Sequence, residues 1–279
     1  MIGTTLVLGG TGKTGSRLVK RLQASGRPVR IGSRAGSPRF DWQDQETWAP
    51  ALQNVQSVYI AYQPDLAFPG AAETVAALAE LAVESGARRP VLLSGRGEES
   101  AQRGEKAVQA SGAEWTIIRS SFMNQNFSES FLLDAVLGGQ LINPVADAAE
   151  PFIDAEDIAD LAFAVLTEEG HRGELYEVTG PALMTFSGAL GEISRVTGLE
   201  VRYVAVSPEE YTAALIEEGV PDDLAASFTE LFATVLDGRN AYLADGVQRG
   251  LGREPRDFAE FARRTAASGA WGGMGGTVK

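Results

Sequence analysis

A glycine-rich loop near the amino terminus carries the clearest chemical signal in the chain. The apolar residues 6–8 run into Gly9-Gly10-Thr11-Gly12-Lys13-Thr14-Gly15. At this spacing Gly9 permits a tight turn, Gly12 lets the backbone approach a pyrophosphate closely, and Gly15 lets the following helix pack on the strand. The free N–H groups at the start of that helix would bind the anion. An ordinary strand-to-helix turn is the alternative, but the position after the first strand favours a dinucleotide site that includes every residue of the loop.

The end of the second apolar segment indicates which dinucleotide is bound. It reads Ile31-Gly32-Ser33-Arg34 and contains no carboxylate, whereas NAD-binding proteins usually present an acidic side chain there to the ribose hydroxyls. Arg34 follows the loop by about 20 residues, and its planar guanidinium can hold a 2′-phosphate and stack on adenine. Ser33 lies beside it, and Arg39 could add a second cation. A solvated surface arginine is the alternative, but the pattern predicts NADPH in preference to NADH.

These residues must be positioned by a regular series of strands and helices. Short, nearly continuous apolar segments of the kind found in buried parallel strands cover residues 4–8, 29–31, 57–61, 91–94 and 115–119. Helical patterns fall between them at residues 14–25 and 71–85, and both end at a glycine, which favours the left-handed conformation of a helix end. This alternation predicts βαβ units and a parallel sheet.

The order of elements changes after residue 170. An apolar segment at 175–178 is followed by helical patterns around 185–197, 208–236 and 255–267. We therefore predict an α/β fold, a Rossmann-type doubly wound parallel sheet with a smaller C-terminal α+β lobe that binds substrate. The expected boundaries are 1–150 for the nucleotide-binding domain, with its elements continuing to about 170, then 171–268 for the lobe and 269–279 for a flexible tail.

Composition narrows the classes of partner and cofactor. The net charge of −13 and a pI near 4.6 would repel a phosphate backbone, so we expect no nucleic acid partner. The chain has no cysteine and a single histidine, His171, which disfavours a metal site. No apolar run reaches the roughly 18 residues of a membrane helix, and Met1 leads into an apolar stretch without a basic region. We expect a cytoplasmic protein that does not bind membranes.

Several longer segments are more specific than the glycine loop. They read Ala61-Tyr62-Gln63-Pro64, Leu92-Leu93-Ser94-Gly95-Arg96-Gly97 with Glu105-Lys106, Ser111 to Arg119, Phe122-Met123-Asn124-Gln125-Asn126-Phe127, Pro151 to Ala159, and Tyr176 to Pro181. With these segments the chain resembles, over nearly its whole length, the NmrA-like atypical short-chain dehydrogenases/reductases. That family includes quinone reductases and triphenylmethane dye reductases.

The resemblance implies further site residues. Segment 60–64 would lie beside the cofactor ribose, and the regions of Ser94 and of residues 122–126 would surround the nicotinamide and the substrate. The cofactor contacts implied in addition to the loop, Ser33 and Arg34 are Ala61, Tyr62, Gln63, Ser94 and Gly95. The implied substrate contacts are Tyr62, Ser94, Phe122, Met123, Asn124, Phe127 and Phe152.

Other polar residues have structural explanations. Arg119 would pair with a carboxylate at the end of a buried strand. Asp154 and Asp157 suit the start of a helix, where a capping Asp is followed three residues later by a second carboxylate. Glu105 would orient a backbone amide or occupy a solvated helix position. His171 lies in a polar segment and is expected at the surface.

The usual active-site pair of the reductase superfamily is missing. That pair is a tyrosine followed four residues later by a lysine, which lowers the pKa of the tyrosine so that it can protonate a substrate oxygen. Residues 100–112, where the pair would lie, contain Lys106 but no tyrosine, and Ala101 stands where many relatives carry a histidine. No catalytic acid can be assigned.

The missing acid favours one class of substrate. The resemblance and the residues together suggest an NADPH-dependent reductase that transfers hydride directly, without flavin or metal, to a quinone or another flat, electron-poor aromatic molecule. The product could belong to natural-product tailoring, where a reduced quinone reacting with O₂ gives net hydroxylation. A homodimer is compatible with the resemblance. The alternative is a non-catalytic NADP(H)-binding redox sensor of NmrA type, and turnover of a quinone panel would distinguish the two.

Overall fold

A computed structural model describes residues 3–130 and 132–272 of the chain. Its internal contacts divide it into two compact units, each assembled from three segments. The first unit comprises Met1–Ser120, Ala155–Val178 and Asp245–Glu254, and the second comprises Ser121–Asp154, Thr179–Ala244 and Pro255–Lys279.

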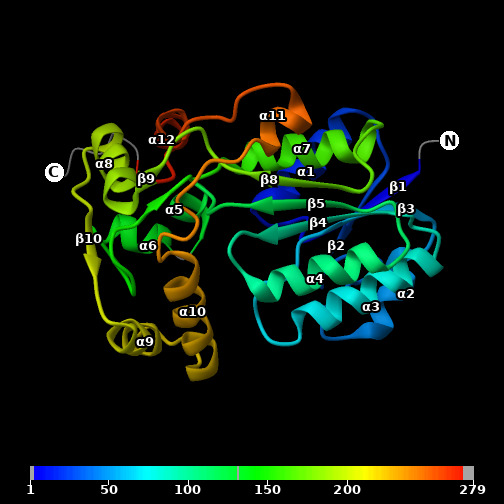
Figure 1. Cartoon of the computed structure of the whole chain (residues 1–279), viewed down its shortest axis with the longest axis horizontal. Helices are drawn as coiled ribbons and strands as arrows, with labels where there is room; N and C mark the ends of the chain where they lie inside the picture. The colour runs from blue at the N-terminus through cyan, green and yellow to red at the C-terminus, as the bar shows by residue number, and fades with distance from the viewer. Residues whose placement is uncertain (1–2, 131, 273–279) are drawn as a thin grey trace. The chain divides into compact units, whose positions relative to one another are not determined.

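The first unit is built on a six-stranded sheet in the order β2-β1-β3-β4-β5-β8, with every neighbouring pair parallel (Figure 1). The strands are β1 (Thr4–Leu8), β2 (Val29–Gly32), β3 (Val55–Ile60), β4 (Arg89–Gly95), β5 (Thr116–Ser120) and β8 (Glu174–Val178). Their apolar residues are buried on both faces, as in Leu6, Val7 and Leu8. This explains why the strands appear in the sequence as continuous apolar runs.

Helices cover both faces of this sheet, so the predicted doubly wound fold is confirmed. The helices are α1 (Lys13–Ala24), η1 (Gln45–Thr47), α2 (Trp48–Leu52), α3 (Ala71–Glu84), α4 (Glu99–Ala110), α7 (Ala155–Thr167) and α11 (Gly246–Leu251). Figure 1 shows α1, α7 and α11 on one face and α3 and α4 on the other. Because both faces are covered, only the edges of the sheet and the strand ends remain for ligands.

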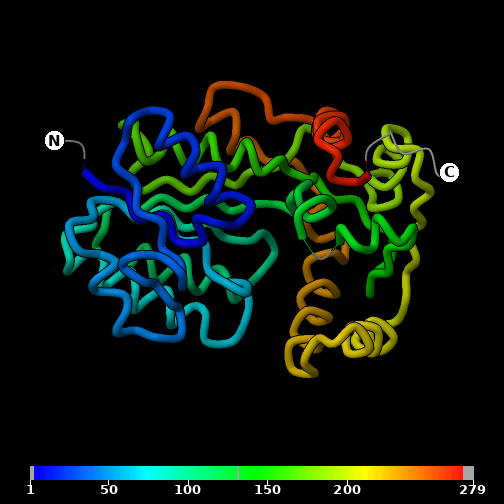
Figure 2. The backbone as a smooth tube through the Cα atoms, turned by 180° about the vertical axis from the view of Figure 1, so that it is seen from behind, coloured from blue at the N-terminus to red at the C-terminus, as the bar shows by residue number. Residues whose placement is uncertain are grey.

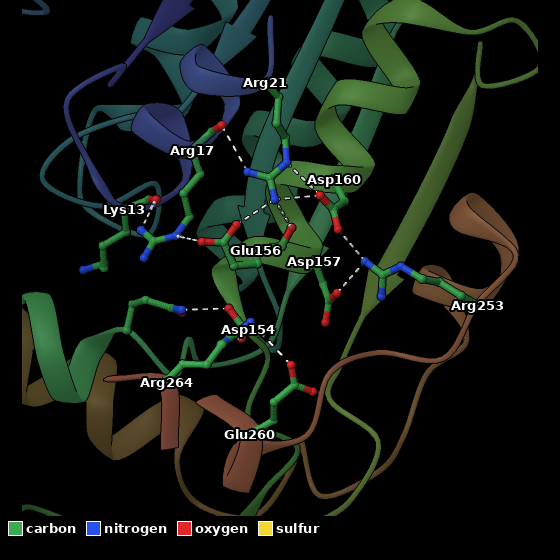
Figure 3. Close-up of polar contacts among 11 residues, drawn as sticks. Lys13, Arg17, Arg21, Asp154, Glu156, Asp157, Asp160, Arg253, Glu260 and Arg264 are labelled. Atoms are coloured by element: carbon green, nitrogen blue, oxygen red, sulfur yellow. Dashed lines mark hydrogen bonds and ion pairs between the residues drawn. The ribbon is translucent and has the colours of Figure 1, made fainter. Parts of the chain in front are cut away.

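A network of ion pairs joins α1, α7 and the segment that follows α11 (Figure 3). Arg17 and Arg21 of α1 bind Glu156 in the first turn of α7, with N–O distances of 2.8 and 2.6 Å. Arg253 binds the fully buried Asp157 at 2.7 Å. Asp157, which was expected in the first turn of a helix, thus also forms an ion pair. Through this pair Arg253 attaches residues 245–254 to the rest of the first unit.

The second unit contains two small sheets and six helices within its described residues. Strands β6 (Gln140–Asn143) and β10 (Arg202–Ala205) pair in parallel, and β7 (Ala149–Glu150) and β9 (Met184–Thr185) pair antiparallel. The helices are α5 (Asn126–Glu129), α6 (Leu132–Leu137), α8 (Phe186–Thr197), α9 (Pro208–Glu217), α10 (Asp222–Val235) and α12 (Phe258–Ser268). Among residues 3–130 and 132–272, no helix is long and apolar enough to cross a membrane.

The helical region expected around 208–236 is found and contains two helices, α9 and α10, separated by a break. Gly219 adopts φ +88°, a left-handed conformation that ends a helix, and Pro221 precedes the second helix. The tube of Figure 2 shows the chain turning sharply between α9 and α10.

The core of the second unit is aromatic and extends into the C-terminal segment. Phe127, Phe152 and Phe186 pack with ring centroids 5.1–5.9 Å apart. Trp271 is 1% exposed, and its indole N–H donates to the carbonyl of Phe127 at 2.8 Å. The flexible tail expected at 269–279 is therefore not seen at its beginning, because a buried tryptophan anchors it. Residues 273–279 lie outside the described residues.

The sequence assigns residues 171–268 to a C-terminal lobe, whereas β8 pairs with β5 in the sheet of the first unit. A short apolar strand does not reveal its pairing partner in its own sequence, and this is why β8 was assigned to the lobe. The division into a nucleotide-binding and a substrate-binding domain stays a prediction.

Candidate functional site

The predicted cofactor residues of the first unit lie at one edge of its sheet. The register pairs Leu8 with Gly32 across β1 and β2, Ile60 with Leu92 across β3 and β4, and Ser94 with Arg119 across β4 and β5. The glycine loop, Arg34 and the segments after β3 and β4 therefore all follow the carboxyl ends of neighbouring parallel strands. In open α/β sheets this is the edge where ligands bind.

Within the glycine loop, two glycines are required by the fold and a third is not. Gly9 has φ +69°, and its carbonyl accepts the N–H of Gly12 at 2.9 Å. A Cβ atom at Gly15 would lie 2.2 Å from the Gly9 oxygen, so α1 could not pack as it does. Gly12 has an ordinary extended backbone, φ −84° and ψ −177°, and its Cβ would meet nothing closer than 3.3 Å. The backbone conformation therefore does not require glycine at position 12, whereas a ligand that passes close to its Cα would.

Thr14 anchors this loop to the sheet. The hydroxyl of Tyr59 on β3 donates to Thr14 Oγ1 at 2.9 Å, and both side chains are buried. Burial raises the pKa of Tyr59 above its usual value, so the phenol keeps its proton. The Thr14 hydroxyl thus holds the start of α1, while Thr11 is exposed and Lys13 is half-buried.

Of the two arginines expected near a 2′-phosphate, the structure leaves one unpaired. Arg39 forms ion pairs with Asp41 at 2.6 Å and Asp44 at 3.3 Å. Arg34 is exposed and forms no ion pair in the described part of the chain, although its charge is among those that lower the pKa of Asp41. Ser33 supports the turn, because its carbonyl accepts N–H groups at 3.0 and 2.9 Å. Arg34 is therefore the cation available to an anionic ligand at this edge.

The segment after β3 lies against the glycine loop. The Cβ of Ala61 would be 3.2 Å from a Cβ at Gly9, and Gln63 Nε2 would be 3.7 Å from one at Gly12. The ring of Tyr62 packs 4.8 Å from that of Trp42. Sequence reasoning did not include Trp42, although the closely spaced aromatic residues at positions 40, 42 and 48 were a visible signal.

Glu105 is the centre of a buried polar cluster behind β4. Its carboxylate accepts the hydroxyl of Ser94 at 2.6 Å and two N–H groups of Arg119 at 2.9 and 2.5 Å. Only 3% of Glu105 is exposed, so the solvated helix position and the backbone-orienting role expected for it are both wrong. The expected pairing of Arg119 with a carboxylate at its strand end is found, with Glu105 as the partner.

The cluster continues across β5 to β8. Arg96 binds Glu177 at 2.8 Å, and Arg119 lies 3.6 Å from the same carboxylate. Arg96 is almost wholly buried. Together with Glu105 these residues make two arginines and two glutamates, so the buried charges compensate each other. The sequence carried no signal for this pairing, because the partners are far apart along the chain.

Two further carboxyl groups face the end of β4. The carboxylate of Glu98 folds over Gly95, so that a Cβ there would lie 2.1 Å from Glu98 Oε1. Burial, followed by the negative charges of Asp65 and Glu105, raises the pKa of Glu98 well above its ordinary value. Burial also raises the pKa of Asp65. Glu98 therefore keeps its proton to higher pH than an exposed glutamate does.

The remaining predicted substrate contacts belong to the second unit, and they differ from one another in exposure. Phe127 and Phe152 are buried in its aromatic core, and Phe122 and Met123 are half-buried. Asn124 is 0% exposed, and neither oxygen nor nitrogen of its amide has a hydrogen-bond partner within the described residues. Of the expected apolar walls, Phe122 and Met123 thus keep surface that a ligand could reach.

Asp154 directly precedes α7, as expected for the start of a helix, whereas the environment of His171 differs from the one expected. Asp154 is fully buried and accepts the side-chain amide of Gln125 at 2.7 Å as well as the guanidinium of Arg264. His171 is half-buried rather than exposed, because its Nδ1 hydrogen-bonds the hydroxyl of Tyr176 on β8 at 2.8 Å.

Comparison with known proteins agrees with this geometry. The chain is 31% identical to the NAD(P)H azoreductase of Xenophilus azovorans over 94% of its own length and 98% of that protein. Its fold matches the NADPH-dependent quinone oxidoreductase of Escherichia coli complexed with NADPH, with a TM-score of 0.77 at 21% identity over 93% of this chain and 99% of that one. It also matches the triphenylmethane reductase of Citrobacter sp. complexed with NADP(H), with a TM-score of 0.74 at 20% identity over 94% and 99%. No model of a known protein family matches the chain.

The parallel sheet with a glycine loop at its carboxyl edge defines an NAD(P)-binding protein of the Rossmann type. The full-length similarity to the azoreductase narrows this class to one family. The chain belongs to the NmrA-like atypical short-chain dehydrogenases/reductases and is an NAD(P)H-dependent oxidoreductase.

Proposed function

We propose that the protein is an NADPH-dependent reductase of quinone-like or polycyclic aromatic small molecules. The observation that carries the choice of cofactor is the unpaired, exposed Arg34 at the end of β2, where no carboxylate precedes it. A free guanidinium favours a 2′-phosphate, and a neighbouring carboxylate would have favoured the free hydroxyls of NADH.

The residues at the sheet edge fit this cofactor. The N–H groups at the start of α1 would hold the pyrophosphate, which passes over the bare Cα of Gly12. Arg34 and Ser33 would hold the 2′-phosphate, and Ala61, Tyr62 and Gln63 would contact a ribose. Ser94 and Gly95 would face the nicotinamide. When bound, NADPH supplies the hydride.

The class of substrate is inferred from the names of the relatives and from the lack of a tyrosine–lysine pair. Azo compounds, triphenylmethane dyes and quinones are conjugated acceptors. A hydride that adds to a quinone gives a delocalised anion that water can protonate, and a hydride that adds to the cation of a triphenylmethane dye gives a neutral product, so neither reaction needs a dedicated acid. Catalysis then rests on holding two rings at about 3 to 3.5 Å, for which Tyr62 at the sheet edge of the first unit offers apolar surface. Reaction of a reduced quinone with O₂ would give net hydroxylation.

We expect the purified protein to oxidise NADPH steadily when a quinone is supplied, without added flavin or metal. The assay would follow NADPH absorbance with a panel of quinones, an azo dye and a triphenylmethane dye, and a reaction without acceptor would serve as the control. If NADPH binds but no acceptor is reduced, a non-catalytic NADP(H) sensor becomes the better explanation, as the missing tyrosine–lysine pair also allows.

The variant Arg34→Ala should bind NADPH about 10- to 100-fold more weakly and NADH unchanged, because a charge-assisted contact with the phosphate contributes roughly 1.5 to 3 kcal/mol. Titration calorimetry would give both dissociation constants. Arg39→Ala is the matched control, since Arg39 lies in the same loop but is paired with Asp41 at 2.6 Å, and it should change neither constant much. Equal affinity of the wild type for the two cofactors would contradict the assignment.

A further inference from the structure

The direction of one hydrogen bond restricts what Ser94 can recognise. A serine hydroxyl has one proton to donate and two lone pairs that accept. Ser94 Oγ donates its proton to Glu105 Oε1 at 2.6 Å. The hydroxyl therefore has no proton left for a ligand as long as this bond is kept.

The neighbouring charges keep this bond in place. Glu105 also accepts two N–H groups from Arg119, at 2.9 and 2.5 Å, and these charge-assisted bonds hold its side chain in place beside Ser94. Glu177 lies 3.6 Å from the far side of the same guanidinium and fixes its orientation. A rotation of the Ser94 hydroxyl toward a ligand would leave a buried carboxylate lacking one partner, which is costly.

The accepting side of Ser94 is unused. Ser94 is 4% exposed, and among residues 3–130 and 132–272 no group donates a hydrogen bond to its oxygen. A buried acceptor without a donor favours any ligand that brings an N–H or O–H group. A quinone or another carbonyl substrate offers only acceptors at its oxygen and cannot pair with Ser94.

The order of the strands indicates which donor reaches it. Strand β3 lies between β1, which carries the glycine loop, and β4, which ends at Ser94 and Gly95. A dinucleotide held by its pyrophosphate at the loop after β1 and by a ribose at the end of β3 reaches β4 with its nicotinamide end. The donor at that end is the NH₂ of the carboxamide.

We propose that Ser94 is a specificity-determining cofactor contact, whose oxygen accepts the carboxamide N–H of the nicotinamide and so orients the ring, and that it makes no hydrogen bond to the substrate oxygen. This inference rests on the proposed function as an NADPH-dependent reductase. It makes the expected cofactor role of Ser94 specific and withdraws its expected substrate role.

The test compares three cofactors on wild type and Ser94→Ala by fluorescence titration, which measures binding without turnover. The cofactors are NADPH, its thionicotinamide analogue, which keeps the NH₂ group, and its 3-acetylpyridine analogue, in which a methyl group replaces NH₂. Ser94→Ala should weaken NADPH and the thionicotinamide analogue about 2- to 12-fold, the net contribution of one hydrogen bond, and should leave the acetylpyridine analogue unchanged. Ser57→Ala, another buried strand hydroxyl, bonded to Thr5 at 2.9 Å near the start of β3, is the matched control and should change none of them.

Each other outcome overturns the inference in a recognisable way. An equal weakening of all three cofactors would mean that Ser94 contacts a ribose hydroxyl or acts only through packing. Unchanged binding of all three would remove Ser94 from the cofactor site while leaving the proposed function intact. If wild type binds no NADPH at all, the proposed function fails and this inference fails with it.

Discussion

Replacing Gly12 by valine should abolish measurable NADPH binding while the protein remains folded. The backbone of Gly12 has a conformation that any residue adopts, and a Cβ there would lie 3.3 Å from the Gly9 oxygen, a tight contact that a shift of a few tenths of an ångström would relieve. The methyl groups would fill the space that a pyrophosphate needs against the N-terminus of α1. Losing several phosphate contacts of roughly 1.5 to 3 kcal/mol each gives a fall in affinity of at least about 100-fold.

The measurement is a fluorescence titration of NADPH beside a thermal melt of the same sample. Gly15→Val is the contrasting variant, because a Cβ at Gly15 would lie 2.2 Å from the Gly9 oxygen and should lower the melting temperature markedly. Gly191→Val, on an open face of α8 with nothing within 4 Å, should affect neither property. A folded Gly12→Val variant that still binds NADPH normally would show that the loop is only a structural turn.

The variant Glu105→Ala should lower the free energy of unfolding by about 3 kcal/mol. The half-buried Arg119 would lose its two hydrogen bonds to Glu105, and the Ser94 hydroxyl would lose its acceptor. The melting temperature would fall by roughly 2 to 4 °C for each kcal/mol lost. Urea denaturation monitored by circular dichroism would give the free energy directly.

The neighbouring Lys106 provides the control for this variant. Its side chain is exposed on the same helix, so Lys106→Ala should change the unfolding free energy by no more than about 0.5 kcal/mol. A loss as small as this for Glu105→Ala would mean that Arg119 and Ser94 find other partners, and the buried cluster would then not hold the end of β4.

Local patterns in the sequence were sufficient for five of the six strands of the sheet and for the glycine loop. The strand expected at 4–8 is β1 as observed, and the helix expected at 71–85 is α3 to within one residue. Such elements are encoded by neighbouring residues, through an apolar run or a helical period followed by glycine. The spacing of the loop glycines is likewise local, so the amino acid sequence alone was enough to locate the candidate cofactor edge.

Long-range pairings could not be predicted in the same way. The bond between Glu105 and Arg119 depends on how α4 packs behind β4 and β5, and the ion pair between Asp157 and Arg253 joins residues that are nearly 100 positions apart. The burial of Phe127 follows from its position in a core assembled from distant helices. A single sequence records the chemistry of each of these residues but not which of the possible partners each one meets.

The assembly of the first unit from three segments has a consequence for biosynthesis. A nascent chain that ends at residue 120 carries five of the six strands. Strand β5 is then an edge strand, and the backbone N–H and C=O groups that later pair with β8 have no partner strand. Asp157 meets Arg253 only when nearly the whole polypeptide has been made. The first unit therefore cannot complete its fold until the last part of the chain has been translated. Premature termination between residues 157 and 253 would release a chain in which Asp157 lacks its ion pair with Arg253, and such incompletely folded chains are removed by cellular quality control.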